Sequence, residues 1–279
     1  MSKGLGETTT QFFQLGSAAE PFVFANGQAL PGITIAYEVY GKLNAKKSNA
    51  ILLFHALSGS QHAAGRTEDV PGLDGRWTED IKQGWWDLFI GPGKALDTNR
   101  YCVICANYLG GCYGSSGPTS MNPETGKPYG RDFPPVLSSD VVRSQAALLD
   151  YLGIQTLHAV IGSSVGGLLA INFATLYPDR VKIVMPVATG LRTTVLTRLT
   201  LFEQVLAIEN DPHFRGGDYY EGQAPEYGLA LARMISHKTF VHLDAIEKRA
   251  SQTLSQPSNQ LSWYQVGRNV ESYMLHQGK

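Results

Sequence analysis

Cysteine is scarce in this 279-residue sequence, which contains only Cys102, Cys105 and Cys112. A small and odd number of cysteines is atypical of a secreted disulfide scaffold and favours a reduced, cytoplasmic protein. Cys102 and Cys105 have the spacing of a metal or redox pair, but they fall in an expected strand, where residues i and i+3 face opposite sides. We therefore expect no metal site at these cysteines.

Long apolar runs and an excess of charge are also missing. No apolar run approaches the roughly 18 residues that a membrane-spanning helix needs, and the N-terminus lacks the apolar region of a signal peptide. The net charge of -1 argues against nucleic acid or an anionic membrane as the main partner. The Gly-Pro-Gly-Lys stretch at 91–94 lacks the spacing and the Ser or Thr of a phosphate-binding loop. These absences favour a globular protein that acts on small molecules without a resident metal or cofactor.

The most informative stretch is residues 162–166, which read Gly-Ser-Ser-Val-Gly. An apolar run at 157–161 precedes it, and a second apolar run at 168–174 follows it. A strand, then Gly-x-Ser-x-Gly, then a helix is the layout of a nucleophile elbow, in which glycines let strand and helix pass closely beside a strained serine. The helix N–H groups there favour negative charge on an attacked carbonyl. The pattern predicts Ser164 as a nucleophile, and the alternative is an inert serine in a small-residue turn.

Strand and helix patterns alternate through the first two thirds of the chain. Apolar or β-forming runs at 33–40, 51–54, 101–107 and 181–188 predict strands, and the amphipathic run at 138–152 predicts a helix. Continuous apolar strands that alternate with helices are typical of a parallel sheet with flanking helices. The sequence therefore predicts an α/β fold with a mostly parallel sheet.

The connecting stretches carry three further expectations. Residues 1 to about 20 are polar and unpatterned, so we expect a frayed arm. Residues 60–83 mix Gly and Asp with other residues and are expected to form a surface excursion. The Gly-, Ser- and Pro-rich loop from 108 to about 135 is too long for a mere connection, so we expect it to serve the functional site.

The strand pattern stops at about residue 190. Helices are expected at 195–209, 226–236 and 242–252, and no further strand is expected before the end of the sequence. We therefore predict two domains: residues 1–190, the N-terminal part of the α/β core, and residues 191–279, a helical cap that is incomplete.

Several motifs occur in one order along the chain. They are His55–Gly59, Gly84–Asp87 with Ile90–Gly93, Asn107–Pro118, the elbow, Gly228–Ile235, and Glu271–Tyr273 with Gln277–Gly278. Together they resemble homoserine O-acetyltransferase and its close relatives, the α/β-hydrolase-fold acyltransferases of methionine and cysteine synthesis. The elbow departs from the family's usual Gly-Gly-Ser-Met-Gly-Gly, which leaves the acyl and acceptor preferences open.

The resemblance implies an α/β-hydrolase fold that moves an acetyl group from acetyl-CoA, a co-substrate, to the side-chain hydroxyl of L-homoserine. Ser164 would carry the acyl group, and the backbone N–H groups of Leu57 and Val165 would form the oxyanion hole. Arg233 would hold the amino-acid carboxylate, because guanidinium geometry suits a bidentate pair. Without the family, an arginine on a cap helix is more often part of an exposed ion pair. The family also implies a homodimer through the cap.

A serine needs a histidine to take its proton and an acid to orient that histidine. In this fold the acid and the base follow the nucleophile, each after a later strand, and this sequence offers no strand after 181–188. Asp244 and His276 have the right order, but the first lies in a helical pattern and the second in a polar tail, whereas His55 resembles the family's structural histidine. We expect the last strands and both triad partners to be absent. The isolated chain should then be inactive and poorly soluble, with an exposed sheet edge and apolar helix faces.

Three functions stay open. The first is the acyltransferase, with succinyl-CoA as donor or serine as acceptor as variants. The second is an esterase of the same fold, whose acyl-enzyme reacts with water instead of an amino acid. The third is a non-catalytic remnant that only binds a ligand or partner, which the missing acid and base favour. The expected partners are acyl-CoA and a small amino acid, with neither nucleic acid nor membrane.

Overall fold

The computed structural model describes residues 4–73, 75–252 and 269–278. The chain divides into two compact units, residues 1–191 and residues 192–279, and each is described by itself. Within the described ranges, no helix is both long enough and apolar enough to cross a membrane.

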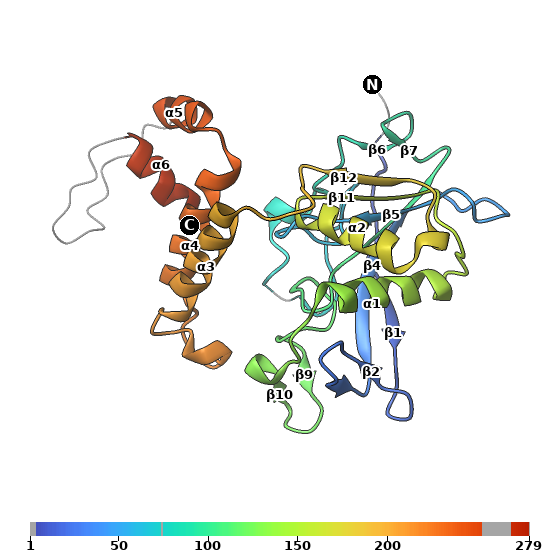
Figure 1. Cartoon of the computed structure of the whole chain (residues 1–279), viewed down its shortest axis with the longest axis horizontal. Coiled ribbons are helices and arrows are strands. Elements are labelled where there is room, and N and C mark those ends of the chain that lie inside the picture. The colour runs from blue at the N-terminus through green and yellow to red at the C-terminus, as the bar shows by residue number, and fades with distance from the viewer. Residues whose placement is uncertain (1–3, 74, 253–268, 279) are drawn as a thin grey trace. The chain divides into compact units, whose positions relative to one another are not determined.

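A six-stranded mixed sheet forms the centre of the first unit (Figure 1). In spatial order its strands are β1 (Gln11–Leu15), β4 (Ile33–Tyr40), β8 (Cys102–Ala106), β5 (Ala50–Phe54), β11 (Ala159–Ser163) and β12 (Val184–Val187). The strands β8, β5, β11 and β12 pair in parallel, whereas β4 pairs antiparallel with both β8 and β1. The predicted α/β fold with a mostly parallel sheet is thus confirmed.

Small elements fill the connections of the first unit. Three two-stranded sheets pair β2 (Phe22–Val23) with β3 (Ala29–Leu30), β6 (Ile90–Gly91) with β7 (Leu96–Asp97), and β9 (Met121–Asn122) with β10 (Lys127–Pro128). Short 3₁₀ helices are η1 (Glu79–Ile81), η2 (Gly130–Asp132) and η3 (Pro178–Arg180).

Two neighbouring helices, α1 (Ser138–Tyr151) and α2 (Val165–Leu176), cover one face of the main sheet (Figure 1). Their apolar side chains, such as Leu148 and Phe173, are fully buried in one cluster with sheet residues such as Leu52. This packing explains why the strands read as continuous apolar runs, because one alternate set of side chains faces the helices.

The opposite face of the sheet is covered mainly by residues 63–64 and by the stretch from Trp85 to Leu96. Ala63 and Ile90 are fully buried there in a second cluster that includes Leu53 of β5. The expectation of a surface excursion at 60–83 was therefore wrong for residues 60–67, which are buried except for Arg66, whereas most of the described residues of 68–83 are exposed. Buried small and polar residues, which carry little hydrophobic signal, make up much of this layer.

The cysteines of β8 follow the alternation expected of a strand. Cys102 is buried on the α1 and α2 side of the sheet, and Cys105 is buried on the opposite side. Burial raises the pKa of the Cys102 thiol to about 11, so this thiol stays protonated at neutral pH. In the described part of the chain, no three His, Cys, Asp or Glu side chains gather as metal ligands would.

The two edges of the sheet differ from each other. The N-terminal edge is β1, whose Phe13 is buried and stacks on Tyr151 with ring centroids 4.8 Å apart, so the expected frayed arm is wrong over 11–15. The other edge is β12, whose side chains Val184, Met185 and Val187 are 37–49% exposed. The exposed sheet edge that the sequence predicts is therefore present.

The second unit is helical. Its helices are α3 (Val195–Glu209), α4 (Glu226–Phe240), α5 (Leu243–Gln252) and α6 (Asn269–Gly278), with a 3₁₀ turn, η4 (Arg215–Gly217), between α3 and α4. The first three confirm the predicted helices, whereas α6 was not predicted, and residues 253–268 lie outside the described residues.

The helices α3 and α4 pack closely because of one glycine. A Cβ atom on Gly228 would lie 2.4 Å from the carbonyl oxygen of Ala207 on α3. The buried carboxylate of Asp211 accepts a hydrogen bond of 2.8 Å from the Gly228 N–H, in the first turn of α4. A carboxylate is favourable there, because helix N-termini carry unpaired N–H groups and a partial positive charge.

Candidate active site

Ser164 lies on the sharp turn between β11 and α2. Its backbone has a φ of 55° and a ψ of -121°, a region that costs a non-glycine residue about 1–3 kcal/mol. The N–H of Ser164 donates to the carbonyl of Val187 at 3.0 Å, and its carbonyl accepts from the N–H of Gly167 at 3.0 Å. The residue is exposed to solvent. The strained strand–turn–helix geometry predicted for residues 162–166 is present.

Glycines make this turn possible. A Cβ atom on Gly162 would lie 2.0 Å from the carbonyl oxygen of Gly166, so strand and helix could not pass if position 162 carried a side chain. A Cβ atom on Gly166 would lie 2.4 Å from the carbonyl oxygen of Phe54 and 2.5 Å from that of His55. The first turn of α2 therefore rests directly on the end of β5.

The two proposed oxyanion donors lie on the segments that meet at this contact. Leu57 follows the end of β5 by three residues, and Val165 is the first residue of α2. Among the described residues, neither the Leu57 N–H nor the Val165 N–H has a backbone acceptor. The side chain of Leu57 is 77% exposed, so this residue contributes little beyond its backbone. Unpaired N–H groups near an exposed serine suit the developing charge of an attacked carbonyl.

His55 is the first residue of the 55–59 loop and is only 2% exposed. Its Nδ1 lies 2.6 Å from the carbonyl oxygen of Ala56, so Nδ1 carries the proton of the neutral ring. Burial lowers the pKa of His55 to about 4, because the charged imidazolium is poorly solvated there. Its ring stacks on Tyr108, with ring centroids 3.7 Å apart, and the Tyr108 hydroxyl donates to the His55 carbonyl oxygen. This histidine is a buried neutral part of the scaffold.

The other two histidines of the first unit are also engaged away from Ser164. His62 is buried and pairs with Glu38 through Nδ1 and Oε2 at 3.0 Å, while its Nε2 lies 2.8 Å from the carbonyl oxygen of Lys82. His158 precedes β11 and therefore lies at the opposite end of the strand from Ser164, about 20 Å away at a rise of about 3.3 Å per residue. The described residues of the first unit thus include no histidine placed as a general base for Ser164.

Three other candidates belong to the second unit and are described with it alone. Arg233 is an exposed residue of α4. Asp244 lies in the first turn of α5, as its helical pattern predicts, and its Oδ2 is 3.6 Å from Nδ1 of His242. His276 is exposed, as a polar stretch predicts, but it lies on the helix α6 instead of in an unstructured tail.

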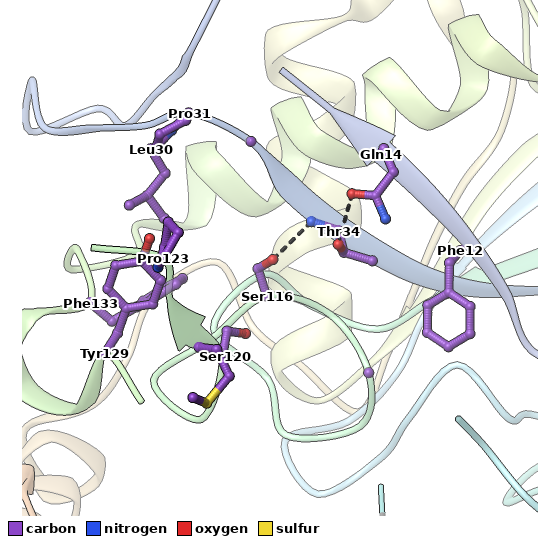
Figure 2. Close-up of a pocket in the computed structure, with 13 residues that line it drawn as sticks. Phe12, Gln14, Leu30, Pro31, Thr34, Ser116, Ser120, Pro123, Tyr129 and Phe133 are labelled. Atoms are coloured by element: carbon purple, nitrogen blue, oxygen red, sulfur yellow. Dashed lines mark hydrogen bonds between the residues drawn. The ribbon is translucent and has the colours of Figure 1, made fainter. Parts of the chain in front are cut away.

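The long loop after β8 lines a cavity of about 400 Å³ with β1 and the start of β4 (Figure 2). The loop is tied to β4 through Ser116, whose hydroxyl accepts the Thr34 N–H at 2.8 Å, and the Thr34 hydroxyl donates to Gln14 at 2.9 Å. Neither Ser164 nor the two oxyanion candidates are among the residues that line this cavity. Within the loop, Tyr108 contacts the candidate site, because its ring and its hydroxyl both contact His55. The sequence pattern did not mark Tyr108 as a functional residue.

Comparisons with known proteins agree on one family. The family model described as alpha/beta hydrolase fold matches residues 49–273. A homoserine O-acetyltransferase from Methanohalobium evestigatum is 44% identical over 99% of this chain, which spans only 54% of that relative's length. A homoserine O-succinyltransferase from Alkalilimnicola ehrlichii is 46% identical over 93% of this chain and 66% of its own length.

Solved structures give the same result. The crystal structure of homoserine O-acetyltransferase from Bacillus anthracis superposes with a TM-score of 0.81 and 32% identity, covering 97% of this chain and 70% of that one. The crystal structure of esterase E22 has a TM-score of 0.82 and 32% identity, with 97% of this chain and 72% of that one covered. The same architecture therefore occurs both in a homoserine acyltransferase and in an esterase.

Proposed function

The chain belongs to the homoserine O-acetyltransferase family of α/β-hydrolase-fold proteins, and on this premise we propose that it moves an acetyl group from acetyl-CoA to L-homoserine. The observation that carries the proposal is the exposed, strained Ser164 beside the end of β5. The N–H groups of Leu57 and Val165, which have no backbone acceptor in the described part of the chain, support it, because acyl transfer requires donors for a tetrahedral oxyanion.

The reaction would proceed in two halves. The Ser164 Oγ attacks the thioester carbonyl, and the resulting oxyanion accepts hydrogen bonds from the Leu57 and Val165 N–H groups, each worth about 2.7–4 kcal/mol. The C–S bond then breaks, and CoA leaves as a thiol with the proton that a general base took from Ser164. The homoserine hydroxyl attacks acetyl-Ser164, its proton returns to the serine oxygen, and O-acetylhomoserine is released.

Other residues and partners complete the proposal. Arg233 would bind the homoserine carboxylate, for which a guanidinium group is suited. The partners would be acyl-CoA and a small amino acid in the cytoplasm, and two copies would associate through the helical unit. Support for this association comes from α3, whose apolar side chains Leu196 and Phe202 are 74% and 59% exposed.

Two alternatives are favoured by specific relatives. Succinyl-CoA as donor is favoured by the similarity to a succinyltransferase, and hydrolysis is favoured by the similarity to an esterase. The experiment is to mix the protein with acetyl-CoA or succinyl-CoA, measure CoA release, and determine the mass of the peptide that contains Ser164. Ser164→Ala is the control without the nucleophile.

The outcomes separate the candidates. The acyltransferase proposal predicts that acetyl-CoA labels Ser164 and that homoserine discharges the label faster than water or serine does, whereas the expected absence of the triad acid and base predicts no label. Labelling by succinyl-CoA alone would assign the succinyl donor. Discharge by water as fast as by homoserine would assign the esterase. Absence of any label and of any CoA release would leave a protein that binds without catalysis and would refute acyl transfer.

A further inference from the structure

The N–H of Leu57 needs an external support, because the loop around it makes few contacts of its own. The Leu57 side chain is 77% exposed and cannot fix the position of its backbone by packing. Within the loop, the Gly59 N–H donates to the Ala56 carbonyl at 3.0 Å, and His55 Nδ1 lies 2.6 Å from the same carbonyl. Both hydrogen bonds lie within the loop. They therefore do not fix the orientation of the loop relative to neighbouring segments.

Tyr108 provides that support from the segment that follows β8. Its ring lies nearly parallel to the His55 ring, at an angle of 17° and with ring centroids 3.7 Å apart. Its hydroxyl donates to the carbonyl oxygen of His55. Burial raises the pKa of the Tyr108 hydroxyl well above its usual range, so this hydroxyl remains a donor at every physiological pH.

The His55 carbonyl is also where the loop meets α2. A Cβ atom on Gly166 would lie 2.5 Å from this carbonyl oxygen, so the backbone of α2 is in contact with it. The oxygen is therefore held by the Tyr108 hydroxyl while it touches the helix turn that begins with Val165. A shift of this peptide group changes the spacing between the two oxyanion donors.

We propose that Tyr108 is a positioning residue, which acts through His55 to hold the Leu57 N–H at the spacing from Val165 that a tetrahedral oxyanion requires. This inference rests on the proposed role of the two N–H groups. Misplacement by about 1 Å in a preorganised site typically reduces rates by about two orders of magnitude, and complete loss of one donor reduces them by about 10²–10³. Loss of the Tyr108 hydroxyl alone should have a smaller effect, about tenfold, because the stacked ring remains.

The test uses phenylboronic acid, whose boron becomes tetrahedral and anionic when the Ser164 oxygen adds to it and the hydroxyl proton passes to solvent. Its affinity is measured by ¹¹B NMR for the wild type, Tyr108→Phe and Tyr108→Met. Tyr151→Phe, a tyrosine variant on α1 without contact to His55, is the matched control. Binding of acetyl-CoA, a trigonal ground-state ligand, is measured in parallel in the Ser164→Ala background, and thermal unfolding verifies that each variant is folded.

The expected result is an adduct about tenfold weaker for Tyr108→Phe, weaker again for Tyr108→Met, and unchanged for Tyr151→Phe, with acetyl-CoA affinity unaltered by Tyr108→Phe. Equal weakening of both ligands would indicate general structural damage and overturn the proposal. Wild-type affinity in both Tyr108 variants, or no tetrahedral adduct in the wild type, would also overturn it. A boronate adduct without acetyl-CoA binding would instead refute the proposed acyl donor and leave the positioning role of Tyr108 supported.

Discussion

Gly162 lies so close to Gly166 that a Cβ atom on Gly162 would be 2.0 Å from the Gly166 carbonyl oxygen. Because the obstructing atom belongs to the backbone, Gly162→Ala must push β11 away from α2. We expect this variant to lower the free energy of unfolding by about 1–3 kcal/mol, the usual effect of overpacking. Urea unfolding measures the change. Gly4→Ala, whose Cβ would meet nothing within 4 Å, should be neutral, and equal stability of the two variants would contradict the argument.

The strained backbone of Ser164 predicts that a substitution there can raise the stability of the protein while abolishing its function. A φ of 55° suits glycine, so Ser164→Gly should relieve strain and raise the free energy of unfolding by about 1 kcal/mol. Ser164→Ala keeps a Cβ atom and should have nearly the stability of the wild type. Urea unfolding compares the three proteins, and neither variant should be acylated. Equal stability of Ser164→Gly and Ser164→Ala would mean that the turn is unstrained.

Buried His55 should make the protein less stable in mild acid. Its pKa is about 4 in the folded protein and about 6.5 in the unfolded chain, so between these values the unfolded state binds more protons. The stabilisation is complete above pH 6.5 and is lost as the pH falls through 4, by about 3 kcal/mol in total. Urea unfolding at pH 7, 5.5 and 4.5 measures this slope. His55→Asn should show a shallower slope, and an identical slope would assign the acid sensitivity to other groups.

The pair of Glu38 and His62 should contribute strongly to stability because both side chains are buried. Glu38 accepts from Thr10 at 2.8 Å and from Tyr40 at 2.9 Å, and it lies 3.0 Å from His62, so Glu38→Ala removes the acceptor of three buried side chains. We expect the free energy of unfolding to fall by about 3–5 kcal/mol, the usual effect of removing one partner of a buried pair. Glu38→Gln should lose less, because its amide oxygen still accepts from Thr10.

An exposed acidic residue provides the control for that prediction. Glu79 pairs with Arg66 on the surface, and its side chain is 69% exposed, so Glu79→Ala should leave the unfolding midpoint nearly unchanged. Urea unfolding of Glu38→Ala, Glu38→Gln and Glu79→Ala measures the change in the free energy of unfolding for each variant. A similar loss in Glu38→Ala and Glu79→Ala would show that burial does not strengthen the pair.

Local patterns predicted the elements that depend on neighbouring residues in the chain. The elbow at 162–166 was predictable because strand, glycines and helix follow one another directly, and the buried strands show the apolar runs that helix-covered sheets produce. The edge strand β1 was missed because only Phe13 of its five residues is buried. A strand that packs one side chain leaves almost no periodic signal.

The burial of residues 60–67 was missed for a different reason. This burial depends on pairing between distant residues, such as His62 with Glu38, and on close approach of Gly84 to Ala64, where a Cβ would lie 2.2 Å from the backbone N. Neither appears in a hydrophobicity pattern. The oxyanion candidates Leu57 and Val165 act through backbone N–H groups, which any residue carries, so no side-chain pattern marks them, and they follow from the elbow layout and the family resemblance. A general base for Ser164 is also invisible to local patterns, because a triad base is distant in sequence from its nucleophile.

The role of Arg233 can be tested separately from the nucleophile. If its guanidinium binds the homoserine carboxylate, Arg233→Ala should leave acetylation of Ser164 by acetyl-CoA unchanged but slow the discharge of acetyl-Ser164 by homoserine. A charge-assisted hydrogen bond contributes about 1.5–3 kcal/mol, so the concentration of homoserine needed for half-maximal discharge should rise by about 10–150-fold. Arg233→Lys should recover only part of the loss, because an ammonium group cannot form the bidentate pair.

The measurement is single-turnover discharge of pre-acetylated protein across a range of homoserine concentrations. Homoserine lactone, which has no free carboxylate and no free hydroxyl, should not discharge the label from either protein. Arg198→Ala on α3 is the matched control, because it removes an arginine from another helix of the same unit and should not alter the homoserine dependence. If Arg233→Ala discharges with the wild-type dependence on homoserine, the carboxylate is bound by another residue. If its acetylation by acetyl-CoA also slows, Arg233 supports the fold or the donor site instead of the acceptor.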